Sequence, residues 1–140
     1  MPRFQLVTLH GTTLDEQVYE VLLPTPDGQI GVFEHHSPLV TMATTGVVSV
    51  RRKSGDKDDD MDHYAIGGGA IEIVDNHVKV LVDEATDSHE IVEEQEQKAI
   101  AEAKKMLSEA RDKISMDKAQ SMIGHHQVRL RVAGLKKRKR

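Results

Sequence analysis

The fold of the first part of the chain is decided by Ile71-Glu72-Ile73-Val74-Asp75-Asn76-His77-Val78-Lys79-Val80. Apolar and polar side chains alternate on both sides of Asp75-Asn76, a pair of residues that favours a tight turn. A period of two in hydrophobicity is typical of strands that bury one face. The stretch therefore predicts a β-hairpin.

The same pattern extends over the first 86 residues, where short apolar runs are separated by Gly, Pro, Asp or Asn. The expected strands are residues 3–9, 17–23, 30–33, 39–42, 46–52, 62–66, 69–74 and 77–83. The run from Arg51 to Asp60 is too highly charged to be buried and is expected to form a protruding loop. Many short strands without helices between them predict an all-β sandwich or flattened barrel.

The hydrophobic pattern changes near Asp87, after which there is no proline and Ala, Glu, Lys, Gln and Met dominate. A first helical stripe comprises Ile100, Ala103, Leu107, Ala110 and Ile114, widened by Ala99 and Met106. A second comprises Ala119, Met122, Ile123, His126, Leu130 and Ala133, and Gly134 is placed to end it. The chain thus divides into a β-sandwich domain (residues 1–86) and a C-terminal α-helical hairpin with a basic tail (residues 87–140).

The expected joint between the helices is Ser115-Met116-Asp117. Ser115 and Asp117 are good N-cap residues, so a hairpin turn fits here. Inside a helix, however, each costs only ~0.5–0.7 kcal/mol relative to alanine. One continuous helix is therefore nearly as accessible as a hairpin, and we expect contacts elsewhere to decide between them.

Composition narrows the classes of function. The chain has 140 residues, a formal net charge of −4 and no cysteine, which fits a reducing compartment and offers no thiolate nucleophile. Its first residues lack an apolar signal region, and no apolar stretch is long enough to span a bilayer. With two Phe, two Tyr and no Trp, an aromatic stacking surface for single-stranded nucleic acid is not expected.

Catalysis and metal binding find no support in the motifs. Two adjacent histidine pairs, 35–36 and 125–126, diverge on a strand or a helix and do not chelate on their own. The aspartates at 56, 58 and 60 resemble a calcium loop, but Met61 and Gly67 stand where glycine and glutamate are required. The three glycines at 67–69 precede a strand, so they indicate a β-bulge or a close backbone approach instead of a phosphate cradle. We therefore expect no enzyme, no metal and no cofactor.

The closing run Lys136-Lys137-Arg138-Lys139-Arg140 has three interpretations. It is a solvated tail, a nucleic-acid anchor or a contact for an acidic protein surface, and a basic cluster alone does not separate these. No recognition helix with base-reading side chains precedes it, which counts against DNA.

The passage Thr25-Pro26-Asp27-Gly28-Gln29-Ile30-Gly31-Val32-Phe33-Glu34-His35-His36-Ser37-Pro38-Leu39-Val40 resembles the epsilon subunit of F-type (bacterial) ATP synthases. That family shows a turn, then G-x-[IL]-G-[IV], then a short loop that ends in H-x-P-L. The matching positions are Gly28, Ile30, Gly31, Val32, His36, Pro38 and Leu39. Residues 68–85 resemble the family's last two strands, and residues 129–132 give a weaker third match.

The resemblance implies a non-catalytic rotor component, whose sandwich lies at the foot of the central stalk and binds the gamma subunit and the ring of c subunits. By position, Asp27, Gly28 and Gln29 are expected to face the ring, although family members often have glutamate where Gln29 stands. Gly31, His36 and Pro38 complete the expected interface, and His36 and Pro38 are expected to shape the loop.

The family's helical hairpin can also extend alongside gamma and obstruct ATP hydrolysis. The resemblance thus implies a regulatory role for the joint and for the basic residues after it, which would pair with acidic surfaces of the catalytic alpha and beta subunits. The expected regulatory residues are Ser115, Asp117, Arg129, Arg131, Lys136, Lys137 and Arg138. We expect the chain to lie at the cytoplasmic side of the cell inner membrane, held there through the complex.

Several members of the family bind ATP through an I-D-x-x-R-A stretch at the start of the first helix. The passage here is Ile91-Val92-Glu93-Glu94-Gln95-Glu96, which lacks the aspartate, the arginine and the alanine. Its added acids would repel phosphate, so we expect no tight binding of ATP.

Two other classes of function stay open at this stage. A nucleic-acid-binding protein would use the basic tail and would lose its salt-dependent binding when residues 136–140 are removed. A β-sandwich scaffold with a coiled-coil tail would self-associate, although the helical stripe is short and rich in alanine for a zipper.

Overall fold

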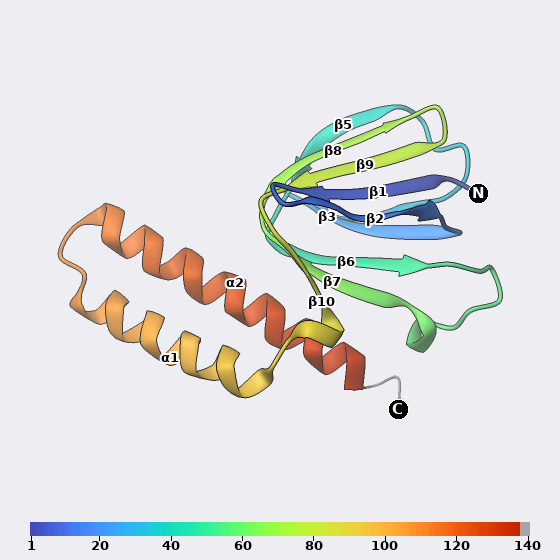
Figure 1. The fold of residues 1–140 in the computed structure, drawn as a ribbon. Helices are drawn as coiled ribbons and strands as arrows, with labels where there is room; N and C mark the ends of the chain where they lie inside the picture. The colour runs from blue at the N-terminus through green and yellow to red at the C-terminus, as the bar shows by residue number, and fades with distance from the viewer. Residues whose placement is uncertain (138–140) are drawn as a thin grey trace.

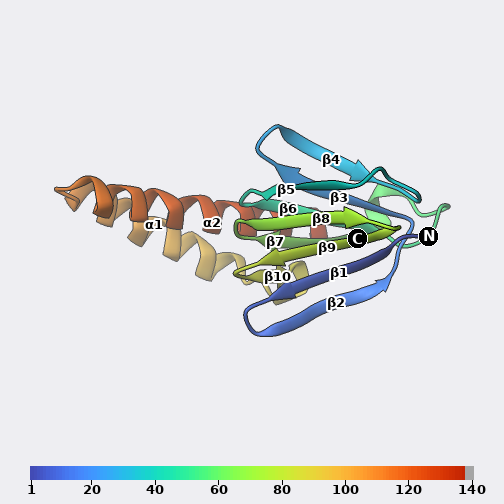
Figure 2. The same cartoon turned by 90° about the horizontal axis from the view of Figure 1, so that it is seen from above.

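The computed structural model describes residues 1–137. Two five-stranded sheets pack face to face, and two helices extend from one side of this body (Figure 1, Figure 2). One sheet, sheet A, has the order β2 (Gly11–Gln17), β1 (Arg3–Thr8), β9 (His77–Val82), β8 (Gly69–Val74) and β5 (Leu39–Ala43). The other, sheet B, has the order β10 (Ala85–Asp87), β7 (Asp62–Ile66), β6 (Gly46–Arg51), β3 (Glu20–Thr25) and β4 (Gly28–Val32). The prediction of a β-sandwich followed by a helical hairpin is confirmed.

The core lies between the two sheets and is made by alternate residues of their strands. Its largest fully buried side chains include Phe4, Leu6, Leu23, Ile71 and Ile73. The hairpin of β8 and β9 turns at Asp75 and Asn76, both with positive φ, as the sequence predicts. Burial of this apolar layer stabilises the body without any contribution from the helices.

Two strands were not predicted. β2 has the polar sequence GTTLDEQ, and its only strongly apolar residue, Leu14, is half-buried, because the strand forms an edge of sheet A. β10 has only three residues and pairs with β7 at the edge of sheet B. A further feature is the parallel pairing of β1 with β9 in the otherwise antiparallel sheet A.

The turn between the helices lies earlier than expected. Helix α1 spans Glu93–Glu109 and α2 spans Lys113–Lys137, so Ser115 and Asp117 belong to the first turns of α2. Asp112 caps α2, because its carboxylate accepts hydrogen bonds from the Ser115 backbone N–H (2.7 Å) and hydroxyl (3.2 Å). These bonds hold the pKa of the Asp112 carboxyl below its usual value.

Two other sequence-based expectations for the helices are wrong. Gly134 does not end α2, which continues to Lys137. Ile114 does not continue the stripe of α1, because it lies after the turn and is 82% exposed. Small side chains dominate the buried apolar positions of the described helix residues, which are Ala103, Ala119, Val132 and Ala133.

The second half of α2 packs on the body, whereas the turn of the hairpin projects away from it (Figure 1). The main contact of α2 outside α1 is with β7, followed by the short 3₁₀ turn η2 (Ser88–Glu90) that leads into α1, and then by β6. The helices therefore lie on the outer face of sheet B at its β10–β7–β6 side and leave β3 and β4 uncovered (Figure 2).

Candidate functional site

The residues expected at the interface with the ring and gamma lie at the two ends of β4. β3 and β4 pair from Thr25↔Gly28 at one end to Val21↔Val32 at the other. Asp27, Gly28 and Gln29 therefore lie at the first end, whereas His36 and Pro38 follow the other end of the strand. The structure does not bring the six expected residues into one cluster.

The turn between β3 and β4 is exposed and built by local hydrogen bonds. Gly28 has φ +115°, a conformation that glycine adopts without strain. The Thr25 hydroxyl donates to the Gly28 carbonyl oxygen at 2.6 Å, and the Thr44 N–H donates to the Pro24 carbonyl oxygen at 3.1 Å. This turn is thereby held beside the β5–β6 turn and presents Asp27 and Gln29 to solvent.

The loop at the other end of β4 is tied to the chain start and to the β8–β9 turn. The His35 backbone N–H donates to Asn76 Oδ1 at 2.9 Å, and the N-terminal amine lies 2.6 Å from Glu34 Oε1. His36 Nδ1 lies 2.6 Å from the Ser37 carbonyl oxygen, in hydrogen-bonding distance. Pro38 is exposed where this loop leads into β5.

The outer face of sheet A carries a row of apolar side chains that the sequence analysis missed. Strand register places Met42, Ala70, Leu81 and Val7 side by side across four strands. Met42 and Leu81 are 66% and 45% exposed, so this row is open to solvent on the side away from the helices. The signal in the sequence was the run Leu39-Val40-Thr41-Met42-Ala43, which would place apolar side chains on both faces of a strand.

A cluster of charges joins the helices to the body, and we call it the seam cluster. It comprises Glu84 after β9, Glu96 of α1, and His125, His126 and Arg129 of α2. Arg129 bridges the two carboxylates: its Nη1 lies 3.3 Å from Glu96 Oε1 and its Nη2 lies 3.1 Å from Glu84 Oε1. His126 Nδ1 is 2.5 Å from Glu96 Oε2, and His125 Nδ1 is 3.5 Å from Glu84 Oε1.

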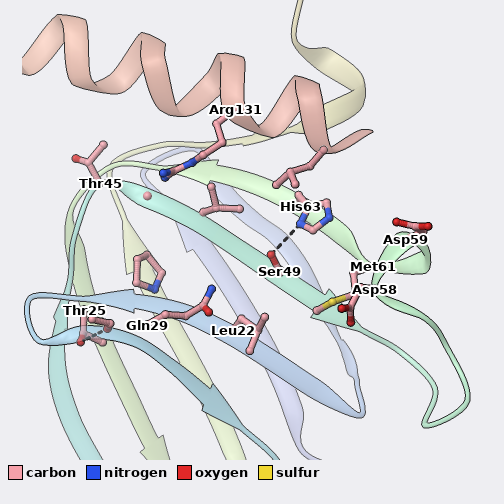
Figure 3. Close-up of a pocket in the computed structure, with 15 residues that line it drawn as sticks. Leu22, Thr25, Gln29, Thr45, Ser49, Asp58, Asp59, Met61, His63 and Arg131 are labelled. Atoms are coloured by element: carbon pink, nitrogen blue, oxygen red, sulfur yellow. Dashed lines mark hydrogen bonds between the residues drawn. The ribbon is translucent and has the colours of Figure 1, made fainter. Parts of the chain in front are cut away.

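A groove of about 640 Å³ lies between the C-terminal half of α2 and the outer face of sheet B (Figure 3). Gln29 and Arg131 line it from opposite sides, so an expected ring-facing residue and an expected regulatory residue share one space. At its floor, the Ser49 hydroxyl and His63 Nδ1 are 2.8 Å apart. Asp58 and Asp59 line its far end, and Leu135 of α2 is also among the lining residues.

The charged loop after β6 is tied back to the body. Arg51 binds Glu20 at 3.0 Å and Asp58 at 2.5 Å, and Arg52 bridges Glu16 of β2 to Asp62 of β7. Arg52 thus links the two sheets at one edge of the sandwich. Next to it, burial raises the pKa of Tyr64, while a hydrogen bond with Arg52 acts in the opposite direction.

The glycine run at 67–69 permits close backbone approach. A Cβ at Gly69 would lie 1.9 Å from the Leu81 carbonyl oxygen on the neighbouring strand, and one at Gly67 would lie 3.0 Å from His125 Cε1. The sequence-based interpretation of these glycines as a close approach is therefore confirmed.

The remaining expected residues lie along α2. Ser115 and Asp117 are exposed near its start, Arg131 is exposed at the groove, and Lys136 and Lys137 end the helix. Arg138 lies outside the described residues. Within residues 1–137, no three histidine or acidic side chains gather as a metal site, and no helix is long and apolar enough to cross a membrane.

Comparison with known proteins assigns a family to this arrangement. The family model described as "ATP synthase, Delta/Epsilon chain, beta-sandwich domain" matches residues 2–88. The ATP synthase epsilon chain of Synechocystis sp. is 34% identical over 133 residues, which are 93% of this chain and 94% of that protein. The epsilon chain of Chloroflexus aggregans is 32% identical over 97% of this chain and 94% of that protein, and the one of Rhizobium etli is 35% identical over 76% of each.

Two solved structures share the fold. A chain in the cryo-EM structure of the Euglena gracilis mitochondrial ATP synthase (OSCP/F1/c-ring) superposes with a TM-score of 0.78 at 24% identity, covering 94% of this chain and 79% of that one. A chain in the central stalk/c-ring structure of the Tetrahymena thermophila enzyme gives a TM-score of 0.67 at 14% identity over 92% and 93%. At these identities the match supports the fold alone.

Proposed function

The chain belongs to the ATP synthase delta/epsilon family, and from that premise we propose that its body couples the stalk to the c ring while its helices restrain ATP hydrolysis. It is a non-catalytic central-stalk subunit of F-type ATP synthase, and its relatives are named ATP synthase epsilon chain. Neither a nucleic-acid-binding protein nor an unrelated scaffold is favoured beside these relatives. The identities of its contacts within the complex and the restraint of hydrolysis are our proposal.

The observation that carries the proposal is the division of the molecule into a self-contained body and a hairpin that docks on it through few groups. The buried core lies entirely within residues 4–82, so the body does not depend on the helices for its core. The helices pack mainly on each other, α2 packs on β7, η2 and β6, and the seam cluster fastens the hairpin to the body. Helices of this kind are marginal alone and depend on a packing partner, which a second subunit can replace.

We assign the apolar row on sheet A to the gamma subunit. This row is suited to contact with an apolar surface on a rigid shaft, because its burial would release water from the surface of four neighbouring strands. Its members are Met42, Ala70, Leu81 and Val7. Its place opposite the helices leaves it available whether or not the helices are docked.

The turn with Asp27, Gly28 and Gln29 is assigned to the c ring. Its exposed backbone and the neutral Gln29 amide suit hydrogen bonding to the polar loops of a ring, with no contribution from a charge at this position. His36 and Pro38, at the other end of β4, shape a separate contact. Through these partners the chain would lie at the cytoplasmic side of the inner membrane without entering it.

The proposed restraint uses the hairpin in an extended form. After release from the body, Arg129, Arg131 and the basic end of α2 would pair with acidic surfaces of the alpha and beta subunits and obstruct hydrolysis. In the docked form Arg129 is occupied by Glu84 and Glu96, so docking and restraint compete for the same guanidinium.

The test is reconstitution of the matching catalytic complex with the full chain or with a chain that ends at Glu90, which keeps all ten strands. We expect both to bind the complex and only the full chain to lower the rate of ATP hydrolysis. Equal hydrolysis with both chains would reject the restraint and leave the stalk role intact. Failure of both chains to bind the stalk would reject the assignment of the contacts.

A further inference from the structure

We propose that the seam cluster is a pH-sensitive latch, in which protonation of a histidine keeps the helices docked on the body. This inference deepens the proposed function, since it names what selects between its docked and extended forms. It rests on the contacts among Glu84, Glu96, His125, His126 and Arg129.

The permanent charges of the cluster do not balance. Two carboxylates face one guanidinium, so the cluster carries one excess negative charge while both imidazoles are neutral. Each imidazole has a ring nitrogen next to one of the carboxylates. One proton on either ring therefore brings the cluster to neutrality, and histidine is the side chain whose charge changes between pH 5 and 8.

Burial makes the pair of Glu96 and His126 the stronger one. Their side chains are 10% and 21% exposed, and charges interact more strongly where water is excluded. His125 and Glu84 are 34% and 46% exposed at 3.5 Å, so their pair is weaker and more strongly screened by salt.

The cluster exists only in the docked form. Glu84 belongs to the body, so release of α2 separates it from His125 and Arg129. Glu96 and His126 are 30 residues apart, and in a continuous helix they would be about 45 Å apart at 1.5 Å per residue. A charged imidazole at His125 or His126 adds an ion pair with a carboxylate that the extended form cannot make, so its protonation favours docking. Rising pH is thus expected to release the helices.

Two other histidines near α2 have partners outside the seam cluster. On the side of η2, His89 Nδ1 pairs with Asp87 at 2.9 Å, and on β7 His63 bonds with Ser49. The remaining charged or titratable groups on the elements that pack against α2 are Asp62 and Tyr64 of β7, Arg51 of β6, Glu90 of η2, the neighbouring Asp83, and Glu93, Glu94, Lys98, Glu102, Lys104, Lys105 and Glu109 of α1. Arg131 on α2 itself faces the groove. His89 offers a matched control, because it is exposed, lies near α2 and pairs with a carboxylate outside the seam cluster.

The experiment measures hydrogen–deuterium exchange of the full chain at pH 6 and pH 8, with each rate divided by the intrinsic chemical rate at that pH. Exchange protection detects release even when the released form is rare. We expect protection of α2 amides to fall by roughly fivefold or more from pH 6 to pH 8, a typical size for coupling between two equilibria. Protection of the core strands β6 and β8 is expected to stay unchanged.

Three variants identify the groups. His125→Gln combined with His126→Gln keeps hydrogen-bonding side chains but cannot take up a proton, so the pH dependence of α2 protection should vanish. Glu84→Gln removes the excess negative charge, so it should weaken or reverse the pH dependence even if the double histidine variant fails to dock. His89→Gln should behave as the unmodified chain.

A pH-independent protection of α2 in the unmodified chain, or pH dependence that survives in both the double variant and Glu84→Gln, would overturn the latch. Because the isolated chain is measured, this outcome is separate from the proposed function. Loss of the latch leaves the hydrolysis assay to decide the restraint, and failure of the restraint leaves the exchange data to decide the latch.

Discussion

Gly67 and His125 meet where the body touches α2: a Cβ added at Gly67 would lie 3.0 Å from His125 Cε1. The Gly67 backbone N–H donates to the Glu84 carbonyl oxygen at 3.2 Å, and the Glu84 carboxylate in turn pairs with His125. A side chain at residue 67 would therefore have to displace the His125 ring that pairs with this carboxylate.

The first prediction concerns Gly67→Ala. The added methyl group should push His125 away from Glu84 and weaken docking of α2 by about 1 kcal/mol, the low end for an extra methyl group in a packed contact. Hydrogen exchange of α2 amides should then be faster, while urea unfolding of the body shifts little. Gly68→Ala is the matched control, because its Cβ would meet only the Ala43 carbonyl oxygen at an ordinary 3.5 Å. Unchanged α2 protection in Gly67→Ala would contradict the tight contact.

The second prediction tests the apolar row on sheet A. Leu81→Glu places a charge between Ala70 and Val7, where a docked shaft would exclude water. The affinity for the isolated gamma subunit, measured by titration calorimetry, should fall about tenfold or more. The circular dichroism spectrum should be unchanged, because Leu81 points outward.

The control for this surface is Lys53→Glu in the exposed loop after β6. Like Leu81→Glu, it makes the net charge of the chain more negative. It should bind gamma as the unmodified chain does. If Leu81→Glu also binds normally, gamma does not use the outer face of sheet A.

The third prediction concerns alkaline pH. Burial raises the pKa of Tyr64, so the folded state favours the neutral phenol while the unfolded chain ionises near pH 10. This contribution to stability is complete below about pH 10 and is lost as the pH rises through the folded pKa. An absorbance titration of tyrosinate should show a late step, which Tyr64→Phe removes. A single step at the ordinary tyrosine pKa in the folded chain would contradict it.

The hairpin of β8 and β9 and the sandwich around it could be predicted, because alternation and turn chemistry agree locally. β2 was missed since an edge strand with one half-buried apolar residue, Leu14, has no such alternation. The helix joint was placed three to five residues too late. Ser115 and Asp117 are good caps by residue type, but Asp112 occupies the cap because its carboxylate reaches the Ser115 N–H.

The seam cluster could not be predicted, because its members are polar and far apart in the chain. Glu84 and Arg129 are separated by 45 residues and Glu96 and His126 by 30, so no periodicity links them. Arg129 was named for a contact with another subunit, whereas in the docked form it bridges two carboxylates of its own chain. Tertiary packing alone brings these groups together.

The last prediction uses proline to fix the hairpin. Lys113 is the first residue of α2, directly after its Asp112 cap, and proline is well tolerated there because that N–H has no partner within the helix. In one continuous helix the same residue would lie in the interior, where proline costs about 3 kcal/mol. Lys113→Pro should therefore keep the hairpin folded and disfavour the extended form by roughly a hundredfold. In the reconstituted complex, it should raise ATP hydrolysis toward the rate seen with the chain that ends at Glu90. Lys113→Ala is the control, because alanine is compatible with both the hairpin and the continuous helix. This variant should still lower the rate of ATP hydrolysis as the unmodified chain does. If the proline variant restrains hydrolysis as strongly as the alanine variant, extension through a continuous helix at this joint is not the mechanism, and the basic end of α2 would have to act from the folded hairpin.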